Sequence, residues 1–455
     1  MRIIDNGVLG IAFVVDDDKN FVGVITDGDI RRAILDGKAL TTPIKKIANA
    51  SPIVIKKEWG KKKINNFLKT SAVKSNMPVH GVMKIPVLDE NNRVVDIVFA
   101  SEDKFESDKL EFEVKSEKIK PVNNILVVGG AGYLGSVLCR KLLNKGYMVR
   151  VLDNLTYGDK GIKDLYDNPN FEFIKGDMRN IQTDVDAIKG MDAVVHLAAI
   201  VGDPASALNP EETIEINYLG TKMLAEICKY SQINRFIFAS TCSVYGASPK
   251  PDIRINEECE LNPVSLYAEM KLKSEQGILE LEDENFSPTI LRMATLYGLS
   301  PRMRFDLVVN ILTIKAVLEK KFTIFGGTQW RPNLHVNDAA DAYIACLTAP
   351  LSKIKGEIFN TGSNGQNYQI MEIGNMVKDL VPSAEKVVDV KNIDERNYNI
   401  SFDKIRKILD YSTTYDIKKG VLEIIEAINN NEFSDYPNKK YNNYLSLKES
   451  DINNF

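Results

Sequence analysis

The sequence predicts an α/β protein: a doubly wound parallel sheet with a smaller C-terminal part, and a separate α+β domain in front of it. Two patterns lead to this prediction. After residue 123, apolar runs typical of buried strands alternate with stretches of helical periodicity. Repeated strand–helix–strand units of this kind form parallel sheets with helices on both faces. Before that point, residues 1–104 hold two similar units of strand, acidic turn, strand and helix start, which indicates a tandem repeat.

Composition limits the classes of function. The 455 residues include 58 Lys and Arg against 62 Asp and Glu, and the net charge of −4 argues against a nucleic-acid partner. The 5 cysteines form no CxxC pair, so we expect neither a disulfide framework nor a metal site. No apolar run reaches the roughly 18 residues that span a bilayer, and the first residues lack the features of a signal peptide. The sequence therefore predicts a cytoplasmic protein that does not bind membranes.

The first N-terminal unit contains the motif Gly23-x-x-Thr26-x-x-Asp29. A strand with a glycine near its end leaves room for a ligand, and the N-terminus of the following helix favours a phosphate. The two units resemble the cystathionine-β-synthase-type (CBS) domain pair, with a first unit that starts part-way through at Met1. The resemblance implies that Thr26 and Asp29 contact the phosphate and ribose of an adenine nucleotide.

The second unit departs from this pattern. It has Asp96, Phe99 and Glu102 where the Gly, Thr and Asp would stand, so at most one intact nucleotide site is expected. The alternative is a packing or dimerisation module without a ligand. Residues 105–122, which follow, are rich in charged residues and poor in apolar ones, as is typical of a linker.

The strongest local signal is the segment ILVVGGAGYLGSVLCRKLLNKGYMVRVLDN. A strand runs into Gly129-x-x-Gly132-x-x-Gly135, a helix follows, and a second strand ends at Asp153. The glycines allow a tight turn and a close approach of backbone N–H groups to a pyrophosphate, while the helix N-terminus adds partial positive charge. A carboxylate at Asp153 can accept hydrogen bonds from ribose hydroxyls and would repel a 2′-phosphate. The sequence therefore predicts NAD, rather than NADP, as the cofactor.

The spacing of these glycines resembles that of the extended short-chain dehydrogenase/reductase family, the nucleotide-sugar epimerases and dehydratases with a Rossmann-type sheet. The resemblance spans residues 123–430. Gly176-Asp177-Met178 matches the segment that reads adenine, and His196-Leu197-Ala198-Ala199 matches the strand end that lines the pyrophosphate. The cofactor-binding residues that the resemblance implies are Gly129, Gly132, Tyr133, Leu134, Gly135, Asp153, Asn154, Asp177, Met178, Leu197, Ala198, Ala199, Asn217, Tyr267 and Lys271.

Tyr267 and Lys271 are four residues apart, so on a helix they share one face. An unperturbed tyrosine titrates near ~10, and a neighbouring ammonium would favour the phenolate and lower the pKa of Tyr267 enough for it to act as a base. Thr241, in the segment ASTCSVYG, stands where the family has its catalytic Ser or Thr. The resemblance implies that its hydroxyl polarises the substrate oxygen. Thr241, Tyr267 and Lys271 are the predicted catalytic residues.

Cys242 and Ser243 follow Thr241 at the positions where the 4,6-dehydratases of this family carry an Asp-Glu pair. Neither side chain is an acid able to protonate a leaving hydroxyl, so the sequence disfavours dehydration. Both residues are instead expected to line the substrate pocket.

The C-terminal third, mainly residues 298–430, is expected to supply the substrate site. Arg331, in TQWRPNLHVND, matches the arginine that binds the substrate diphosphate in the family, and a guanidinium meets phosphate oxygens in pairs. Arg396 is predicted to play a similar role. Arg304 and Asn310 lie in SPRMRFDLVVN and are also predicted to contact the substrate. Arg304 and its neighbour Arg302 are the weaker candidates, with surface salt bridges as the alternative. This run resembles a subgroup that includes heptose-nucleotide C4 oxidoreductases.

Together these features predict a CBS pair fused to an NAD-binding enzyme, with a polar tail at residues 431–455 that is loose or bound to a partner. The preferred function is epimerisation of a nucleotide-linked sugar, at C4, through a transient keto intermediate. A nucleotide-sugar 4-dehydrogenase or reductase is the alternative, and a 4,6-dehydratase or a non-catalytic nucleotide sensor is less favoured. The family expectation is a homodimer. No motif identifies the nucleotide base or the sugar.

Overall fold

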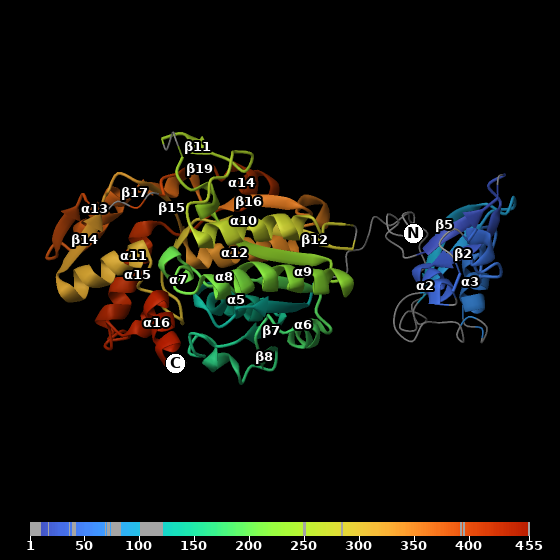
Figure 1. Cartoon of the computed structure of the whole chain (residues 1–455), viewed down its shortest axis with the longest axis horizontal. Coiled ribbons are helices and arrows are strands. Elements are labelled where there is room, and N and C mark those ends of the chain that lie inside the picture. Colours follow the sequence, from blue (N-terminus) through green and yellow to red (C-terminus); the bar gives the residue numbers. More distant parts are fainter. Residues whose placement is uncertain are drawn as a thin grey trace. The chain divides into compact units, whose positions relative to one another are not determined.

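The computed structural model divides the chain into two compact units, Met1–Lys118 and Ile119–Phe455. Figure 1 shows the first unit in blue and the second in colours from teal to red. The structure describes residues 11–16, 18–35, 37–38, 42–68, 70, 73, 83–100, 122–248, 252–283, 285–391, 394 and 396–453. Glu102 and nearly all of the expected linker lie outside the described residues.

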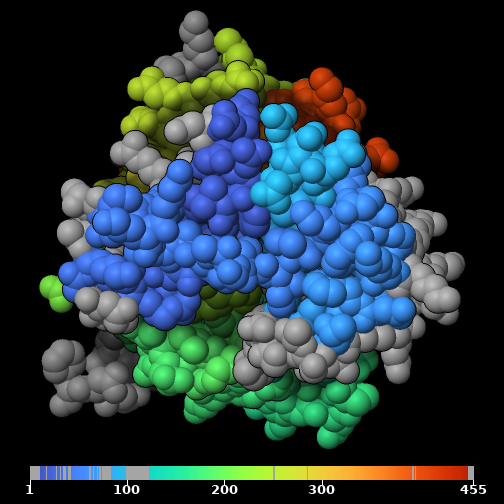
Figure 2. Space-filling view, turned by 90° about the vertical axis from the view of Figure 1, so that its right-hand side faces the viewer, coloured from blue at the N-terminus to red at the C-terminus, as the bar shows by residue number. Residues whose placement is uncertain are grey.

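The N-terminal unit contains two antiparallel strand pairs, β1–β2 and β4–β5, and β3 adds to the second pair in parallel. In Figure 2 the blue residues of this unit form one continuous surface. Helix α3 covers the second sheet with Ile64 and Leu68, which pack with Ile55 and Ile85 of the strands. The elements are β1 (Ile11–Val15), β2 (Phe21–Thr26), α2 (Asp27–Leu35), β3 (Ile55–Lys56), α3 (Lys61–Leu68), β4 (Met83–Leu88) and β5 (Val94–Ala100).

The turns of the two strand pairs have the same geometry, which supports the tandem repeat. Asp16 and Asp89 each accept, through Oδ1, hydrogen bonds from the backbone N–H groups two and four residues further on. Lys19 and Asn92, each three residues after its aspartate, both adopt a positive φ, 65° and 58°. Two separate segments therefore fold into one turn type because each supplies an aspartate at the same position of the loop.

The second unit is built on a seven-stranded sheet in which every pair of neighbours is parallel. The strand order is β16-β12-β10-β9-β6-β7-β8. The chain runs from β6 outward through β7 and β8 and then returns to the other side of β6, so the sheet is doubly wound, as predicted. Ligands bind such sheets at the C-terminal ends of the strands, where the order reverses. The strands are β6 (Asn124–Val128), β7 (Met148–Asp153), β8 (Phe171–Lys175), β9 (Ala193–His196), β10 (Arg235–Thr241), β12 (Ser287–Met293) and β16 (Glu357–Thr361).

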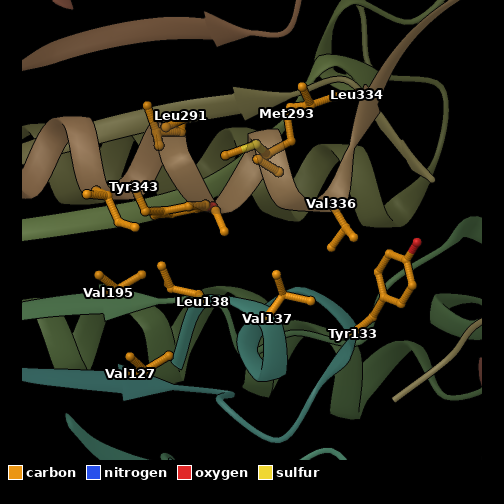
Figure 3. Packing of buried hydrophobic residues seen from close by; sticks show 14 of the residues in the cluster. Val127, Tyr133, Val137, Leu138, Val195, Leu291, Met293, Leu334, Val336 and Tyr343 are labelled. Atoms are coloured by element: carbon orange, nitrogen blue, oxygen red, sulfur yellow. The ribbon is translucent and has the colours of Figure 1, made fainter. Parts of the chain in front are cut away.

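Helices cover both faces of this sheet. Helices α5 and α12 pack together on one face, while α6, α9 and α10 pack together on the other. Figure 3 shows the apolar core between the sheet and the α5–α12 layer, where Val127 and Val195 of the sheet face Leu138 of α5 and Tyr343 of α12. The helices are α5 (Tyr133–Asn144), α6 (Ile181–Ile188), α7 (Asp203–Ser206), α8 (Pro210–Ile214), α9 (Thr221–Tyr230), α10 (Leu266–Leu279) and α12 (Val336–Thr348).

The smaller C-terminal part has its own apolar core, to which Phe322, Ile324, Ile373 and Val421 contribute. Short sheets β13-β15-β17, β14-β18 and β11-β19 lie beside it. The elements are β11 (Arg254–Ile255), β13 (Thr295–Tyr297), α11 (Val308–Ile314), β14 (Lys321–Phe325), β15 (Trp330–His335), β17 (Asn367–Gln369), α13 (Ile370–Leu380), β18 (Glu385–Asp389), β19 (Asn399–Ile400), α14 (Asp403–Leu409), α15 (Ile417–Asn429) and α16 (Asn443–Asn453).

The expectation of a loose tail after residue 430 is wrong for the described residues. Phe433 and Tyr441 are buried against Phe305, with ring centroids 5.0 and 5.3 Å from the Phe305 ring. The backbone N–H of Phe305 also donates to the carbonyl of Tyr441 at 2.8 Å. Widely spaced aromatic residues in a polar segment give no helical or strand periodicity, which is why the sequence pattern did not reveal this packing.

Within the part of the chain that the structure describes, no helix is long and apolar enough to cross a membrane. The same residues contain no cluster of three or more His, Cys, Asp or Glu side chains placed to hold a metal ion.

Candidate active site

A cavity of about 810 Å³ lies at the C-terminal ends of β6, β9 and β10, between the large sheet and the C-terminal part. It is large enough for a dinucleotide and a second ligand side by side. The structure brings together in its wall most of the predicted site residues: Gly129, Gly132, Tyr133, Leu134, Gly135, Asp153, Asn154, Asp177, Met178, Leu197, Ala198, Ala199, Thr241, Ser243, Tyr267, Lys271, Arg304, Arg331 and Arg396.

Three predicted site residues lie behind the wall instead. The Cys242 thiol faces the carbonyl of Arg292 at 3.3 Å, and burial raises the pKa of this thiol. Asn310 is fully buried and supports the neighbouring loop, since it accepts from the N–H of Gly298 and donates to the carbonyl of Arg304. Asn217 is likewise buried and holds the backbone of Ile200 through two hydrogen bonds. The structure therefore places these three in supporting positions outside the cavity wall, and a direct ligand contact for any of them stays a prediction.

The glycine turn has the shape that a pyrophosphate requires. Gly129 has φ +84°, and an added Cβ would lie 2.6 Å from the backbone nitrogen of Ala198. At Gly135, a Cβ would lie 2.5 Å from the carbonyl oxygen of Gly129, so only glycine lets helix α5 pack this close to the strand end. Helix α5 begins directly after Gly132 and directs its free N–H groups towards the turn.

Two carboxylates lie in the cavity wall where the neighbouring strands β7 and β8 end. Asp153 accepts hydrogen bonds from the N–H groups of Ala131 and Leu155, and burial raises its pKa. These contacts hold the carboxylate at the strand end and leave further lone pairs for ribose hydroxyls. Asp177 is already held by Arg179, whose hydrogen bonds lower the pKa of this carboxyl group. The adenine contact assigned to Asp177 stays a prediction.

Arg302, a weaker candidate from the sequence, lies in the cavity wall. Its side chain is 5% exposed, and among the described residues its Nε and Nη2 have no hydrogen-bond partner. The guanidinium stacks on Tyr157 at 4.3 Å, and the Arg302 Cβ lies beside Gly161, next to the carbonyl of Ala131 in the glycine turn. A buried guanidinium with free donors is costly unless an anion meets it. Together with the N-terminus of α5 at the glycine turn, these donors suit the pyrophosphate of NAD.

We expect Arg302→Met to weaken NAD binding about tenfold, because the variant removes donors to a charged ligand but keeps most of the side chain's volume. NAD content of the purified protein and a fluorescence titration of the stripped protein both measure this loss. Arg406→Met is the control, since Arg406 lies on α14 with a side chain 72% exposed. Unchanged NAD affinity in Arg302→Met would rule out the assigned contact.

Tyr267 lies in the first turn of α10, where Ser265 caps the helix by accepting the N–H of Ala268. Thr241, at the end of β10, lines the same cavity. Burial raises the pKa of Tyr267 to about 12, the charge of Asp203 adds to the rise, and the neighbouring Thr241 opposes it. The structure thus brings two residues that are distant in the sequence into one wall of the cavity.

Lys271, one turn further along α10, is 2% exposed. Its Nζ donates to the carbonyl of Ala239 at 2.7 Å and lies 4.6 Å from the ring centroid of Phe238. Burial lowers the pKa of Lys271 to about 7, although the charge of Glu275 partly opposes this. The structure corrects the expectation of a lowered pKa at Tyr267, because burial disfavours the charged form of both groups and outweighs their mutual attraction.

Because burial lowers the pKa of Lys271 to about 7 from 10.5, we expect this lysine to cost stability at neutral pH. The unfolded chain binds more protons than the folded one between these two values, so stability rises with pH through that window. Lys271→Met removes this dependence and should raise the unfolding free energy at pH 7 by about 2 kcal/mol. Urea unfolding at pH 7 and pH 10 measures the difference, which should shrink at the higher pH. A parent protein whose stability stays flat across this window would contradict the shift.

A buried ion pair anchors helix α10, which carries Tyr267 and Lys271. Glu275, one turn after Lys271, accepts hydrogen bonds from Arg292 of β12, and both side chains are 2% exposed. Glu275 also accepts the hydroxyl of Ser240, the residue before Thr241. This carboxylate therefore links α10, β10 and β12 at the level of the catalytic residues. Removing one partner would leave an uncompensated buried charge.

The two predicted diphosphate ligands lie in the cavity wall and share a carboxylate. Arg331 pairs with Asp394 at 2.9 Å, and Arg396 pairs with Asp394 and also with Asp203, at 3.1 Å. Arg304 is paired with its neighbour Asp306 at 2.9 Å. These arginines converge from strand β15 and two separate loops, and each is already held in place by an acid.

A dinucleotide cradle with a Thr–Tyr–Lys set at its end defines the class of protein: a Rossmann-type enzyme that moves hydride and a proton. A family model described as the NAD dependent epimerase/dehydratase family matches residues 125–362. The chain belongs to this family and uses NAD as its cofactor. A CBS domain model matches residues 1–36.

Individual relatives agree with this assignment. A putative UDP-glucose 4-epimerase of Methanocaldococcus jannaschii is 31% identical over 314 residues, which are 68% of this chain and 99% of the relative. A dTDP-glucose 4,6-dehydratase of Streptomyces niveus is 27% identical over 319 residues, 68% of this chain and 93% of the relative. The crystal structure of the UDP-glucuronic acid 4-epimerase from Bacillus cereus, in complex with UDP-glucuronic acid and NAD, is 31% identical, with a TM-score of 0.60. The matched region covers 68% of this chain and 99% of the chain in that crystal structure.

Proposed function

We propose that the enzyme epimerises a nucleotide-linked sugar at C4 through a transient keto intermediate. The observation that carries this proposal is the Thr241–Tyr267 pair at the mouth of the dinucleotide cradle, with Lys271 one turn away on the same helix. Arg331 and Arg396 in the same cavity suit a diphosphate. The relatives whose names contain a 4-epimerase support C4 as the position.

In this mechanism Tyr267 takes the proton of the sugar hydroxyl while the attached carbon loses a hydride. Bound NAD supplies a hydride acceptor that is reduced and then reoxidised within one turnover. Thr241 keeps the phenol and the sugar oxygen in line, the charge of Arg304 favours the phenolate against its burial, and Lys271 places an amine one turn away on the same helix. Tyr267 would return the proton to the keto oxygen once the sugar has rotated in the cavity and presents its opposite face to the cofactor. No net oxidation or reduction results.

Other outcomes of the same chemistry fit the site less well. Dehydration needs an acid beside Thr241, but Cys242 is buried and Ser243 is a hydroxyl that lies 3.4 Å from the hydroxyl of Tyr398. A 4-dehydrogenase or reductase would use the same residues and release the keto-sugar, so it remains the second candidate. A nucleotide sensor without turnover would need neither Tyr267 nor Lys271.

Incubation of the purified protein with UDP-, GDP-, CDP- and dTDP-sugars, without added cofactor, tests the proposal. NMR reports the configuration at C4, and absorbance at 340 nm reports NADH. Inversion at C4 without net NADH is the expected result. Stoichiometric NADH with a keto product would establish the dehydrogenase instead, and no conversion of any of these substrates would overturn the enzymatic proposal for this substrate class.

We also propose that the N-terminal unit binds an adenine nucleotide through Thr26 and Asp29. Asp29 accepts hydrogen bonds from the backbone and the hydroxyl of Thr26, at 2.8 and 2.7 Å, so the two side chains are held together at the start of α2. Gly23 does not widen this site as its motif suggests, because an added Cβ would lie 2.4 Å from the carbonyl oxygen of Asn49. Its lack of a side chain instead lets β2 pack closely against the segment that holds Asn49.

AMP or ATP at 100 times its Kd should stabilise the protein by about 2.7 kcal/mol through mass action and raise its melting temperature. Thr26→Ala should reduce this shift. Thr70→Ala is the matched control, since Thr70 lies in the same unit and bonds only to the carbonyl of Phe67 among the described contacts. Absence of any nucleotide-dependent shift in the parent protein would leave the unit as a packing module.

A further inference from the structure

Asp203 joins two parts of the site that are far apart in the sequence. It begins helix α7, and its side chain, 26% exposed, lies in the cavity wall. Its Oδ1 accepts the hydroxyl of Ser265 at 2.7 Å, and its Oδ2 pairs with Nη1 of Arg396 at 3.1 Å. A carboxylate can serve both donors at once because each of its oxygens accepts independently.

Ser265 transmits this contact to the catalytic helix. It is the N-cap of α10, and its Oγ accepts the N–H of Ala268 at 3.3 Å, a long hydrogen bond. Tyr267 lies between the cap and Ala268. When the Ser265 hydroxyl donates to a carboxylate, its oxygen becomes a better acceptor, because linked hydrogen bonds polarise one another. The strength of the cap therefore depends on how fully Asp203 is available to Ser265.

Arg396 sets that availability. It is shared between Asp203 and Asp394, and it is one of the arginines that the proposed function assigns to the substrate diphosphate. A phosphate that binds the guanidinium competes with both carboxylates for the same N–H groups. Asp394 keeps a second partner in Arg331, whereas Asp203 is left with Ser265 as its polar partner among the described contacts.

We propose that Asp203 is a positioning residue that couples binding of the substrate diphosphate at Arg396 to the N-terminal turn of α10, and so to Tyr267. The inference rests on the proposed function, because it takes Arg396 as a diphosphate ligand. The bound diphosphate draws Arg396 away from Asp203, Asp203 then bonds more strongly to Ser265, and the cap of the catalytic helix tightens. The phenol is thus held most firmly when substrate is present.

Hydrogen exchange of the full-length protein, followed by mass spectrometry on peptides that cover residues 266–272, tests this coupling without any turnover. UDP is the probe, and calorimetry measures its binding to each variant. In the parent protein, saturating UDP should slow exchange in the first turn of α10 about fivefold. Asp203→Asn should bind UDP without this slowing, because a neutral amide does not form the ion pair with Arg396 whose release is proposed to strengthen the cap.

Two further variants test separately the contact of Asp203 with Ser265 and the contacts of Arg396 with its carboxylates. Ser265→Ala should also lose the UDP-dependent slowing while its UDP affinity stays within about twofold of the parent value, since it leaves both arginines untouched. Asp394→Asn removes the other carboxylate on Arg396 but should keep the slowing, because Asp394 does not contact Ser265. Persistence of the slowing in Asp203→Asn with UDP bound would refute the coupling while leaving the proposed function intact. A parent protein that does not bind UDP, GDP, CDP or dTDP would refute the diphosphate assignment itself, and the coupling with it.

Discussion

The Tyr267→Phe variant should lose turnover by about 10³-fold while it keeps its NAD, because the substitution removes the oxygen that takes the proton from the sugar and later returns it. The ring of Tyr267 is 9% exposed, and Phe fills the same space. The substitution exposes no buried charge. Turnover is measured as C4 inversion of the nucleotide sugar by NMR, and NAD content by mass spectrometry of the purified protein.

Tyr343→Phe is the matched control for this substitution. Tyr343 is also fully buried, on α12, and among the described residues its hydroxyl has no hydrogen-bond partner. Removing that hydroxyl should change turnover less than about twofold. If Tyr267→Phe keeps turnover close to the parent level, another group must take the proton, and the mechanism proposed above fails.

The second large effect concerns the packing of the C-terminal segment. Phe305→Ala should lower the free energy of unfolding by about 3–5 kcal/mol, because Phe305 is 2% exposed and its ring contacts Phe433, Tyr436 and Tyr441. The segment that follows them also lines the cavity through Asn442, Asn443 and Tyr444. The variant should therefore bind ligands more weakly as well as unfold more readily. Urea unfolding and a UDP titration measure the two effects.

Leu445→Ala is the control for this prediction. Leu445 lies on α16, the helix that follows the aromatic cluster, but is 42% exposed. It should change stability by less than about 0.5 kcal/mol. Limited proteolysis adds a structural readout: cleavage after residue 430 should accelerate in Phe305→Ala and not in Leu445→Ala. Equal stability of the two variants would show that the aromatic cluster contributes little to the fold.

Predictions that depend on neighbouring residues in the chain succeeded. The glycine turn lies between a strand and a helix that adjoin it in the sequence, and the described geometry at Gly129 and Gly135 matches the reason for which glycine was expected there. The alternation of strands and helices likewise predicted the doubly wound sheet, because the handedness and shortness of crossovers leave few other arrangements. Spacing within α10 placed Tyr267 and Lys271 on one helix.

Predictions that depend on distant residues were less successful. Cys242, directly after β10, and Asn310, on α11, were expected to face a ligand but lie behind the cavity wall, because the direction of each side chain is decided by the elements packed around it. The sequence pointed to Lys271 as a charge beside Tyr267 but could not weigh that charge against burial. Arg302 was only a weaker candidate for the substrate diphosphate, since no local pattern shows that a guanidinium ends without partners.

By itself, the sequence determined the family and the cofactor and predicted the catalytic set, because a phosphate turn and a helical Tyr–Lys pair are local arrangements of a few residues. Only the tertiary structure decided which arginines meet in the cavity, which acids hold them, and that the C-terminal segment closes one side of it. These features arise from contacts between residues as far apart in the sequence as Asp203 and Arg396. Burial and all of the neighbouring groups together then set the charge of each side chain.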